Sequence, residues 1–238
     1  MIQPAILGNL MRNASAPAYT YYDIGFGGGT VNRNFSGLSF RETGFPTNSA
    51  GSLMLYLSFL STEGLTLTPP SGWTTISVPT PSGFSFVASY KISSGSEPAS
   101  ATWSWGTSCS GNIQLVSFTK AGGTWVEPGT IDFISSSSEV KGETSGEHTY
   151  STASIDIPDK SILLSTFFFG PAAETLTTAP IGMTTTLNSI YNGGTWGANS
   201  TWYKIYSATA SDVVTSLVCE GSAAVTVDKK QWIIAARD

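Results

Sequence analysis

The feature that most constrains the fold of this chain is an internal repeat. The segment SLMLYLSFLSTEGLTLTPPSGWTT, which starts at Ser52, aligns with SILLSTFFFGPAAETLTTAPIGMTT, which starts at Ser161. Two more landmarks recur in the same order: residues 90–92 (YKI) with 203–205, and residues 112–120 with 229–237, aligned on Gln114 and Gln231. Ordered self-similarity of this length indicates one structural unit written twice. The sequence therefore predicts two copies, at residues 21–121 and 124–238, packed together or sharing a continuous sheet system.

Each copy has the pattern of antiparallel β-strands. Aromatic and β-branched residues alternate with other side chains in segments such as GFSFVASYKI (residues 83–92) and ATWSWG (residues 101–106), which is typical of strands. Turn clusters of Pro, Gly, Ser and Asn recur about every ten residues, the spacing of an antiparallel sandwich. Capped helix patterns are not found. The predicted fold class is all-β, with two tandem antiparallel β-sandwich (jelly-roll-like) repeats.

The landmarks carry local expectations. The first long strand of each copy is apolar on both faces, which suits a central strand covered by a second layer. Trp73 and Met183, each just after a Pro-x-Gly turn, are expected to close one end of a sandwich. The glycines at 27–29 indicate a turn or bulge. The polar stretch 135–146 is expected to form an exposed loop or a ragged pair of strands.

The charge content narrows the classes of partner. Only 11% of the residues are charged, with 11 Lys and Arg against 16 Asp and Glu. A nucleic-acid binder needs clustered basic side chains to neutralise phosphates, so no nucleic-acid partner is expected. The longest apolar runs are shorter than the roughly 18 residues of a membrane-spanning helix, so no membrane insertion is expected. A surface this poor in charge is unusual for a free monomer and favours burial against neighbouring subunits.

Patterns that carry chemistry are sparse. His148 is the single histidine, which excludes a His-based metal cluster, and calcium motifs of the D-x-D-x-D-G type are absent. Asp132 and Asp156 could complete a Ser-His-Asp site, but there is no G-x-S-x-G elbow, and we interpret the polar segment around His148 as a solvated loop. Cys109 and Cys219 could pair, but we favour two buried thiols on strands. We therefore predict no catalytic residue, no metal and no cofactor.

Seven tryptophans raise the alternative of carbohydrate binding, because exposed aromatic faces stack on sugar rings. In a two-copy sandwich, most of these side chains should lie in the core or between the copies. Trp196, inside the turn sequence NGGTWGANS, is the candidate most expected to be exposed. Together with Asn192 and Asn199 it forms the predicted glycan contact.

A tandem motif set suggests a family. An apolar strand is followed by Pro-Pro-Ser-Gly-Trp-Thr, then Tyr-Lys-Ile, then a Ser-Gly-Ser-Glu-Pro turn and Thr-Trp-Ser-Trp. This pattern resembles a group of bacteriophage and prophage virion proteins of the tail-fibre, head-fibre or capsid-decoration type. The resemblance covers residues 46–121 strongly and 158–238 more weakly, because Met183 replaces the tryptophan and no Glu-Pro follows Lys204. Residues 1–45 lie outside it.

The resemblance implies a non-enzymatic, β-rich building block of a phage particle, often trimeric, with one end bound to the particle. We therefore expect a protein of the virion surface, assembled in the host cytoplasm, whose partners are the major capsid protein, other virion proteins or its own copies. Residues 1–20, which have no counterpart in the second copy, would form the anchoring arm. Its apolar contact residues would be Ile2, Pro4, Ile6, Leu7, Leu10 and Met11.

Two alternatives stay open on the sequence. The first is a tail-fibre or receptor-binding module whose distal turns, at 192–199 or 135–148, contact host surface glycans. The second is a glycan-active enzyme, although the carboxylate pair of such an enzyme cannot be identified from sequence spacing.

Overall fold

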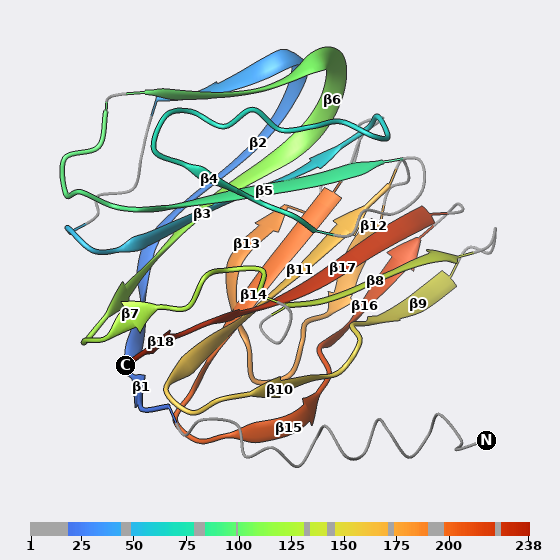
Figure 1. Cartoon of the computed structure of the whole chain (residues 1–238). Helices are drawn as coiled ribbons and strands as arrows, with labels where there is room; N and C mark the ends of the chain where they lie inside the picture. Colours follow the sequence, from blue (N-terminus) through green and yellow to red (C-terminus); the bar gives the residue numbers. More distant parts are fainter. Residues whose placement is uncertain are drawn as a thin grey trace, which may run out of the picture.

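The computed structural model describes residues 19–43, 49–78, 84–98, 100–130, 134–141, 146–170, 174–189, 198–221 and 225–238. The regular elements in these ranges are all β-strands, arranged in antiparallel layers (Figure 1). The all-β class and the layered antiparallel architecture predicted from the sequence are therefore confirmed.

Two five-stranded sheets form the centre of the molecule, one above the other in Figure 1. The first sheet has the strand order β2 (Ile24–Glu42), β6 (Ala101–Lys120), β3 (Leu53–Leu60), β5 (Ser85–Ile92) and β4 (Thr74–Ile76). The second has the order β8 (Ile134–Lys141), β17 (Val225–Ile234), β11 (Ser161–Phe169), β14 (Ala198–Tyr206) and β13 (Thr184–Ser189). Strands that the repeat places in correspondence therefore occupy the same places in both sheets.

The strand register supports most of the repeat alignment. Tyr90 of β5 and Tyr203 of β14 pair with equivalent leucines of the central strands, Leu55 and Leu164. The edge strands β4 and β13 follow their Pro-x-Gly turns and pair with these same two tyrosines. The number of repeats and their boundaries at 21–121 and 124–238 stay predictions.

The last landmark aligns one residue away from its predicted place. Val116 and Trp232 pair with the same two equivalent leucines of β3 and β11. Counting back two residues, Gln114 corresponds to Lys230 and not to Gln231. Because side chains of a strand alternate between its faces, this one-residue difference places Gln114 and Gln231 on opposite faces of their sheets. The sequence alignment matched Gln114 with Gln231 because both residues are glutamines.

One apolar layer joins the two sheets face to face. Phe168 of β11 lies at its centre, with its ring centroid 5.4 Å from that of Phe59 and 5.2 Å from that of Phe86, both from the first sheet. Tyr203 stacks on Phe26 with a centroid distance of 4.6 Å. The layer also holds alternate residues of the central strands of both sheets: Leu53, Leu55, Leu57, Ile162 and Leu164. The two halves of the chain thus share a core.

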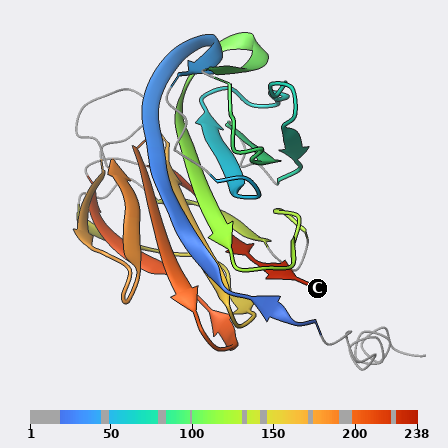
Figure 2. The same cartoon turned by 90° about the vertical axis from the view of Figure 1, so that its left-hand side faces the viewer.

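The outer face of the first sheet is covered by the ends of its own two longest strands. β2 and β6 run side by side and curve over the top of the molecule, as Figure 2 shows. Their pairing shifts register between Gly37 and Ser39, and Gly106 adopts a positive φ of 74°, so the paired strands turn there. A further register shift at Gly28 confirms the predicted bulge. Trp73 is buried in the resulting outer core, as expected.

The outer face of the second sheet is covered by separate strands. β9 (Gly146–Ser151), β16 (Ser216–Gly221) and β12 (Glu174–Thr178) form a three-stranded sheet over one part of it. The pair β10 (Ile155–Ile157) and β15 (Ala210–Val213) covers another part, and the half-buried Met183 contacts both regions. β1 (Tyr21–Tyr22), β18 (Ala236–Arg237) and β7 (Thr124–Trp125) form a small sheet near the C-terminus.

The central strands are apolar on both faces because each lies between two layers. All eight residues of β3 and all nine of β11 are buried. Even-numbered side chains of β11, such as Ile162, face the shared core, and odd-numbered ones, such as Phe167, face the outer layer. The expectation of two covered central strands is confirmed. Fully burying each large apolar side chain contributes about 1.5–3 kcal/mol.

We predict that Phe168→Ala lowers the free energy of unfolding by about 3–5 kcal/mol, because the substitution leaves a cavity between the two sheets. Urea denaturation followed by tryptophan fluorescence measures this change. Ile181→Ala is the control: the Ile181 side chain is 95% exposed, so its truncation should change stability by less than about 0.5 kcal/mol. Equal effects of the two substitutions would contradict a shared core centred on Phe168.

Candidate functional site

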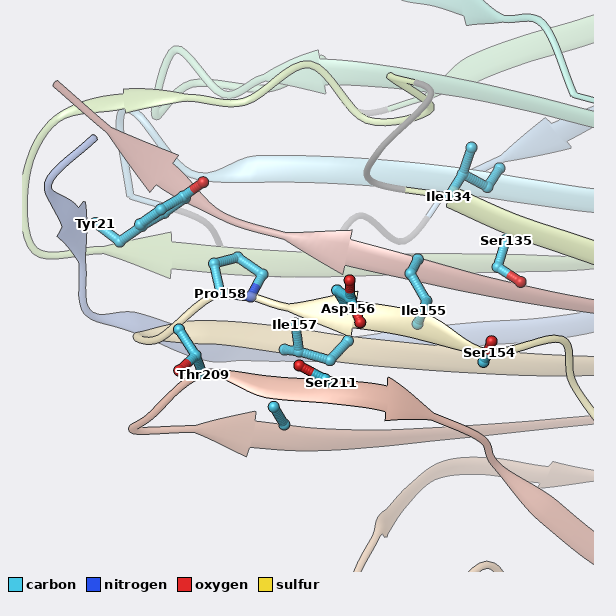
Figure 3. Close-up of a pocket in the computed structure, with 11 residues that line it drawn as sticks. Tyr21, Ile134, Ser135, Ser154, Ile155, Asp156, Ile157, Pro158, Thr209 and Ser211 are labelled. Carbon is cyan, nitrogen blue, oxygen red and sulfur yellow. The ribbon is translucent and has the colours of Figure 1, made fainter. Parts of the chain in front are cut away.

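A cavity of about 600 Å³ opens beside the strand pair β10–β15 (Figure 3). Its walls come from four parts of the chain: β1, the start of β8, β10 with its flanking residues, and the segment that enters β15. The polar side chains that line it belong to Tyr21, Ser135, Ser154, Asp156, Thr209 and Ser211.

Strand alternation places Asp156 at this cavity. Ile155 and Ile157, on either side of it, are buried in the outer core of the second sheet, so the side chain between them points outward. Its Oδ1 accepts a hydrogen bond of 2.9 Å from the backbone N–H of Asp212, which has a positive φ of 52°. Asp156 therefore helps to hold β15 in place as well as lining the cavity.

The lining chemistry suits binding of a polar, hydroxylated group. Hydroxyl groups can both donate and accept hydrogen bonds, and an ionised carboxylate accepts them. Asp156 is the only carboxylate among the described lining residues. Glycoside hydrolysis commonly uses a pair of carboxyl groups, and one carboxylate does not supply that pair.

The interpretation of His148 as a solvated loop residue is wrong. His148 lies in β9, opposite Cys219 of β16, and its side chain is only 10% exposed. Its Nδ1 lies 3.7 Å from Oε1 of Glu174 and 3.3 Å from the Tyr150 hydroxyl. The expected loop or ragged strand pair at 135–146 is also corrected, because β8 and β9 are separate strands that pair with β17 and β16. Both corrections follow from long-range pairing, which local polarity does not reveal.

Burial controls the ionisation of the groups around His148. The Glu174 side chain is fully buried, and this burial raises the pKa of its carboxyl group, although Tyr150 and His148 favour the ionised form. Gly221 lies directly opposite Glu174 in the strand pair. A side chain at position 221 would occupy the space of the Glu174 carboxylate. Burial, with a smaller contribution from Glu174, raises the pKa of the Cys219 thiol to about 12. The thiol is therefore protonated at neutral pH and is a poor nucleophile.

A second buried polar group lies between the two sheets. Lys230 donates hydrogen bonds of 2.6 Å to Asp228 Oδ1 and to Ser136 Oγ, and its Nζ lies 5.3 Å from the centroid of the Phe86 ring. Burial raises the pKa of Asp228 and lowers that of Lys230, while each charge partly offsets the shift of the other. We did not predict this pair, although Asp228 and Lys230, two positions apart in the segment VTVDKKQWII, lie on the same face of a strand with apolar ends.

The residues predicted from the sequence fall into two groups. Trp196 and Asn192 of the glycan contact, and the anchor residues at 2–11, lie outside the described residues. Asn199 lies in β14, where it is the pairing partner of Phe168. The glycan contact and the anchor residues therefore stay predictions.

The remaining sequence expectations concern the tryptophans and the thiols. Trp103, Trp105 and Trp202 are buried in outer cores, as expected for most of the tryptophans. Cys109 and Cys219 are buried, free thiols in two different cores, which confirms the favoured interpretation.

The described ranges show neither a metal cluster nor a membrane-spanning helix. Within them, His, Cys, Asp and Glu side chains do not form a group of three or more that could hold a metal ion. The same ranges contain no helix long and apolar enough to cross a membrane.

Comparison with known proteins adds no relative: no family model matches the chain, and neither the curated proteins nor the solved structures include a match.

We predict that Glu174→Gln stabilises the protein more at pH 7 than at pH 4. The raised pKa of Glu174 means that its contribution to stability is present below the unfolded pKa and is lost as the pH rises through the folded pKa. The neutral amide removes this loss. Urea denaturation at both pH values measures the difference. The exposed Glu63→Gln serves as control and should show no such pH-dependent gain; an equal gain in both variants would contradict the assignment.

We predict that Lys230→Met lowers the free energy of unfolding by about 3–5 kcal/mol, because it leaves Asp228 buried without its cation. The double variant Asp228→Leu/Lys230→Met should lose much less, since neither charge is then buried alone. A double-mutant cycle by urea denaturation measures the coupling. Additive effects of the two single substitutions would show that the ion pair does not act as a unit.

Proposed function

We propose that this chain is a non-enzymatic structural protein of a bacteriophage particle, which decorates or projects from the capsid surface. Its partners would be the major capsid protein or other virion proteins, and its own copies in a homo-oligomer such as a trimer. The proposal starts from the motif resemblance described above. The observation that carries it is that the tryptophans of the motif set, Trp73, Trp103 and Trp105, are buried in the outer core of the first sheet.

The aromatic motif residues form one packed unit on the first sheet. The Trp103 ring stacks on Tyr56 with a centroid distance of 4.3 Å, and Trp73 packs edge-on against Trp103 at 5.0 Å. The indole N–H of Trp103 donates to Ser89 Oγ at 3.1 Å, and that of Trp105 donates to the Gly37 carbonyl at 3.0 Å. These buried rings hold the N-terminal part of β6 over the outer face of the first sheet, so their role is structural.

The exposed apolar side chains support assembly with other subunits. Large apolar residues are exposed at several sites of the described surface: Tyr19, Leu38, Ile92, Ile181, Ile205 and Val214. Only 11% of the residues of the chain are charged. Contacts with neighbouring subunits would bury these side chains and offset the low charge of the surface.

Immunogold labelling of intact particles tests the location. Gold is expected over the capsid surface and absent from particles assembled without this chain. Label confined to the tail would instead support a tail-fibre or receptor-binding module. Particles that carry no label would contradict both forms of the proposal.

We also predict that deletion of residues 1–18 leaves the sheets folded but abolishes attachment to particles. The deletion stops before Tyr19 and Thr20 because these two residues contact the C-terminus. The Thr20 backbone N–H donates to the side-chain Oδ1 of Asp238 at 3.0 Å, and the Asp238 backbone N–H donates to the Thr20 carbonyl at 3.2 Å. Arg237 lies over the Tyr19 ring. Co-sedimentation with particles measures attachment, and circular dichroism checks the fold. Unchanged occupancy of the truncated chain would overturn the assignment of the arm.

A further inference from the structure

An equivalent lysine in each half of the chain has different neighbours. In the first half, Lys91 of β5 forms an ion pair with Glu97. Glu97 belongs to the turn 93–98 that follows β5, and its Oε1 accepts a hydrogen bond of 3.0 Å from the Ser94 backbone N–H. The chain thus folds its own acidic turn over the lysine.

Lys204 of β14 occupies the same place in the second half. Each lysine directly follows the tyrosine that pairs with an equivalent leucine of the central strand. Each also lies beside the glycine of a Pro-x-Gly turn. A Cβ added at Gly72 would lie 3.7 Å from Lys91 Cε, and one added at Gly182 would lie 3.8 Å from Lys204 Nζ. Both glycines have positive φ, 82° and 68°. The local geometry around the two cations therefore corresponds.

The acidic turn has no equivalent in the second half. After β14, the chain enters β15, which pairs with β10 in the outer layer. Lys204 Nζ instead lies 4.9 Å from the centroid of the Tyr206 ring. Among the described residues, no carboxylate lies within ion-pair distance of it. The second half thus presents a cation where the first half holds a neutralised pair.

A cavity of about 360 Å³ lies next to Lys204. It is lined by residues from the Pro-x-Gly turn and from the segment between β15 and β16: Pro180, Ile181, Met183, Val213, Val214 and Thr215. Ile181 stands where the first half has Ser71 and is 95% exposed, and Val214 is 48% exposed. A cation and aliphatic side chains therefore face the same open space.

We propose that this Lys204 cavity binds an acidic turn of another polypeptide chain, with a carboxylate on Lys204 Nζ and apolar atoms on Ile181 and Val214. The first half shows the kind of occupant, because there a peptide turn supplies the carboxylate to the equivalent lysine. Tyr206 is the one aromatic residue among the described residues of the lining, and Lys204 Nζ lies over its ring. The exposed Ile181 and Val214 are aliphatic, which suits side chains of a polypeptide better than the flat face of a sugar ring. Charge-assisted hydrogen bonds to a partly enclosed lysine give such a contact specificity.

A titration of the isolated full-length chain tests this inference. The probe is a synthetic peptide with blocked ends and the sequence of residues 93–98, SSGSEP. Nuclear magnetic resonance follows the methyl group of Met183, which lines the cavity, and that of the fully buried Met54 as internal reference. The peptide should shift the Met183 signal alone. The matched peptide SSGSQP should bind at least about tenfold more weakly, because it lacks the charge.

Two protein variants locate the contact. Lys204→Met should weaken SSGSEP binding by the same factor, whereas Lys91→Met, which changes the equivalent lysine of the first half, should leave binding unchanged. The amide spectra of both variants report whether they fold. A Met183 shift that is equal for SSGSEP and SSGSQP, or no shift at all, would overturn the inference. A shift with glucuronate but not with the peptide would overturn the polypeptide assignment and indicate an acidic saccharide.

The inference does not depend on the proposed particle location. The titration uses the chain alone, so a negative result leaves the labelling of particles to be judged separately. Conversely, particles without label would not affect the binding of SSGSEP at Lys204.

Discussion

The apolar layer between the two five-stranded sheets is the constraint on which the rest of the structure depends. Phe168, held between Phe59 and Phe86, marks its centre. Since each sheet uses one face for this layer, its other face would be left in water unless further strands covered it. The first half covers that face by bending β2 and β6, and the second half by adding β9, β12 and β16. Four layers thus follow from two apolar central strands.

Polar side chains mark where the two halves differ. Gln114 accepts a hydrogen bond of 2.6 Å from Thr201 across the shared layer, and the equivalent position in the second sheet holds Lys230, paired with Asp228. At the outer ends, the first half neutralises Lys91 with its own Glu97, while the second half leaves Lys204 beside a cavity. Because buried charges are costly unless paired, such positions tolerate few solutions. The two halves thus differ in how they satisfy equivalent polar positions.

This asymmetry fits a protein whose work is done through contacts. The motif tryptophans Trp73, Trp103 and Trp105 are buried and contribute to packing, as the stack of Trp103 on Tyr56 illustrates. The cavities beside Asp156 and beside Lys204 differ in chemistry. The first is rich in hydroxyl groups, and the second combines a lysine with aliphatic side chains.

The sequence by itself determined the all-β class, the two buried central strands and most of the correspondence in register between the two sheets, because strand alternation and Pro-x-Gly turns are local patterns. It did not align Gln114 with Lys230. Residues 111–118 of β6 and 227–234 of β17 are buried on both faces, so a one-residue change of register leaves no break in the run of buried residues while it turns every side chain to the other face. Nor did it predict that His148 is buried or that the cavity of Figure 3 exists. His148 is buried by the pairing of β9 with β16, and the cavity is lined by residues 21, 134–135, 154–158 and 209–211, segments that lie far apart along the chain. Only the tertiary structure brings them together.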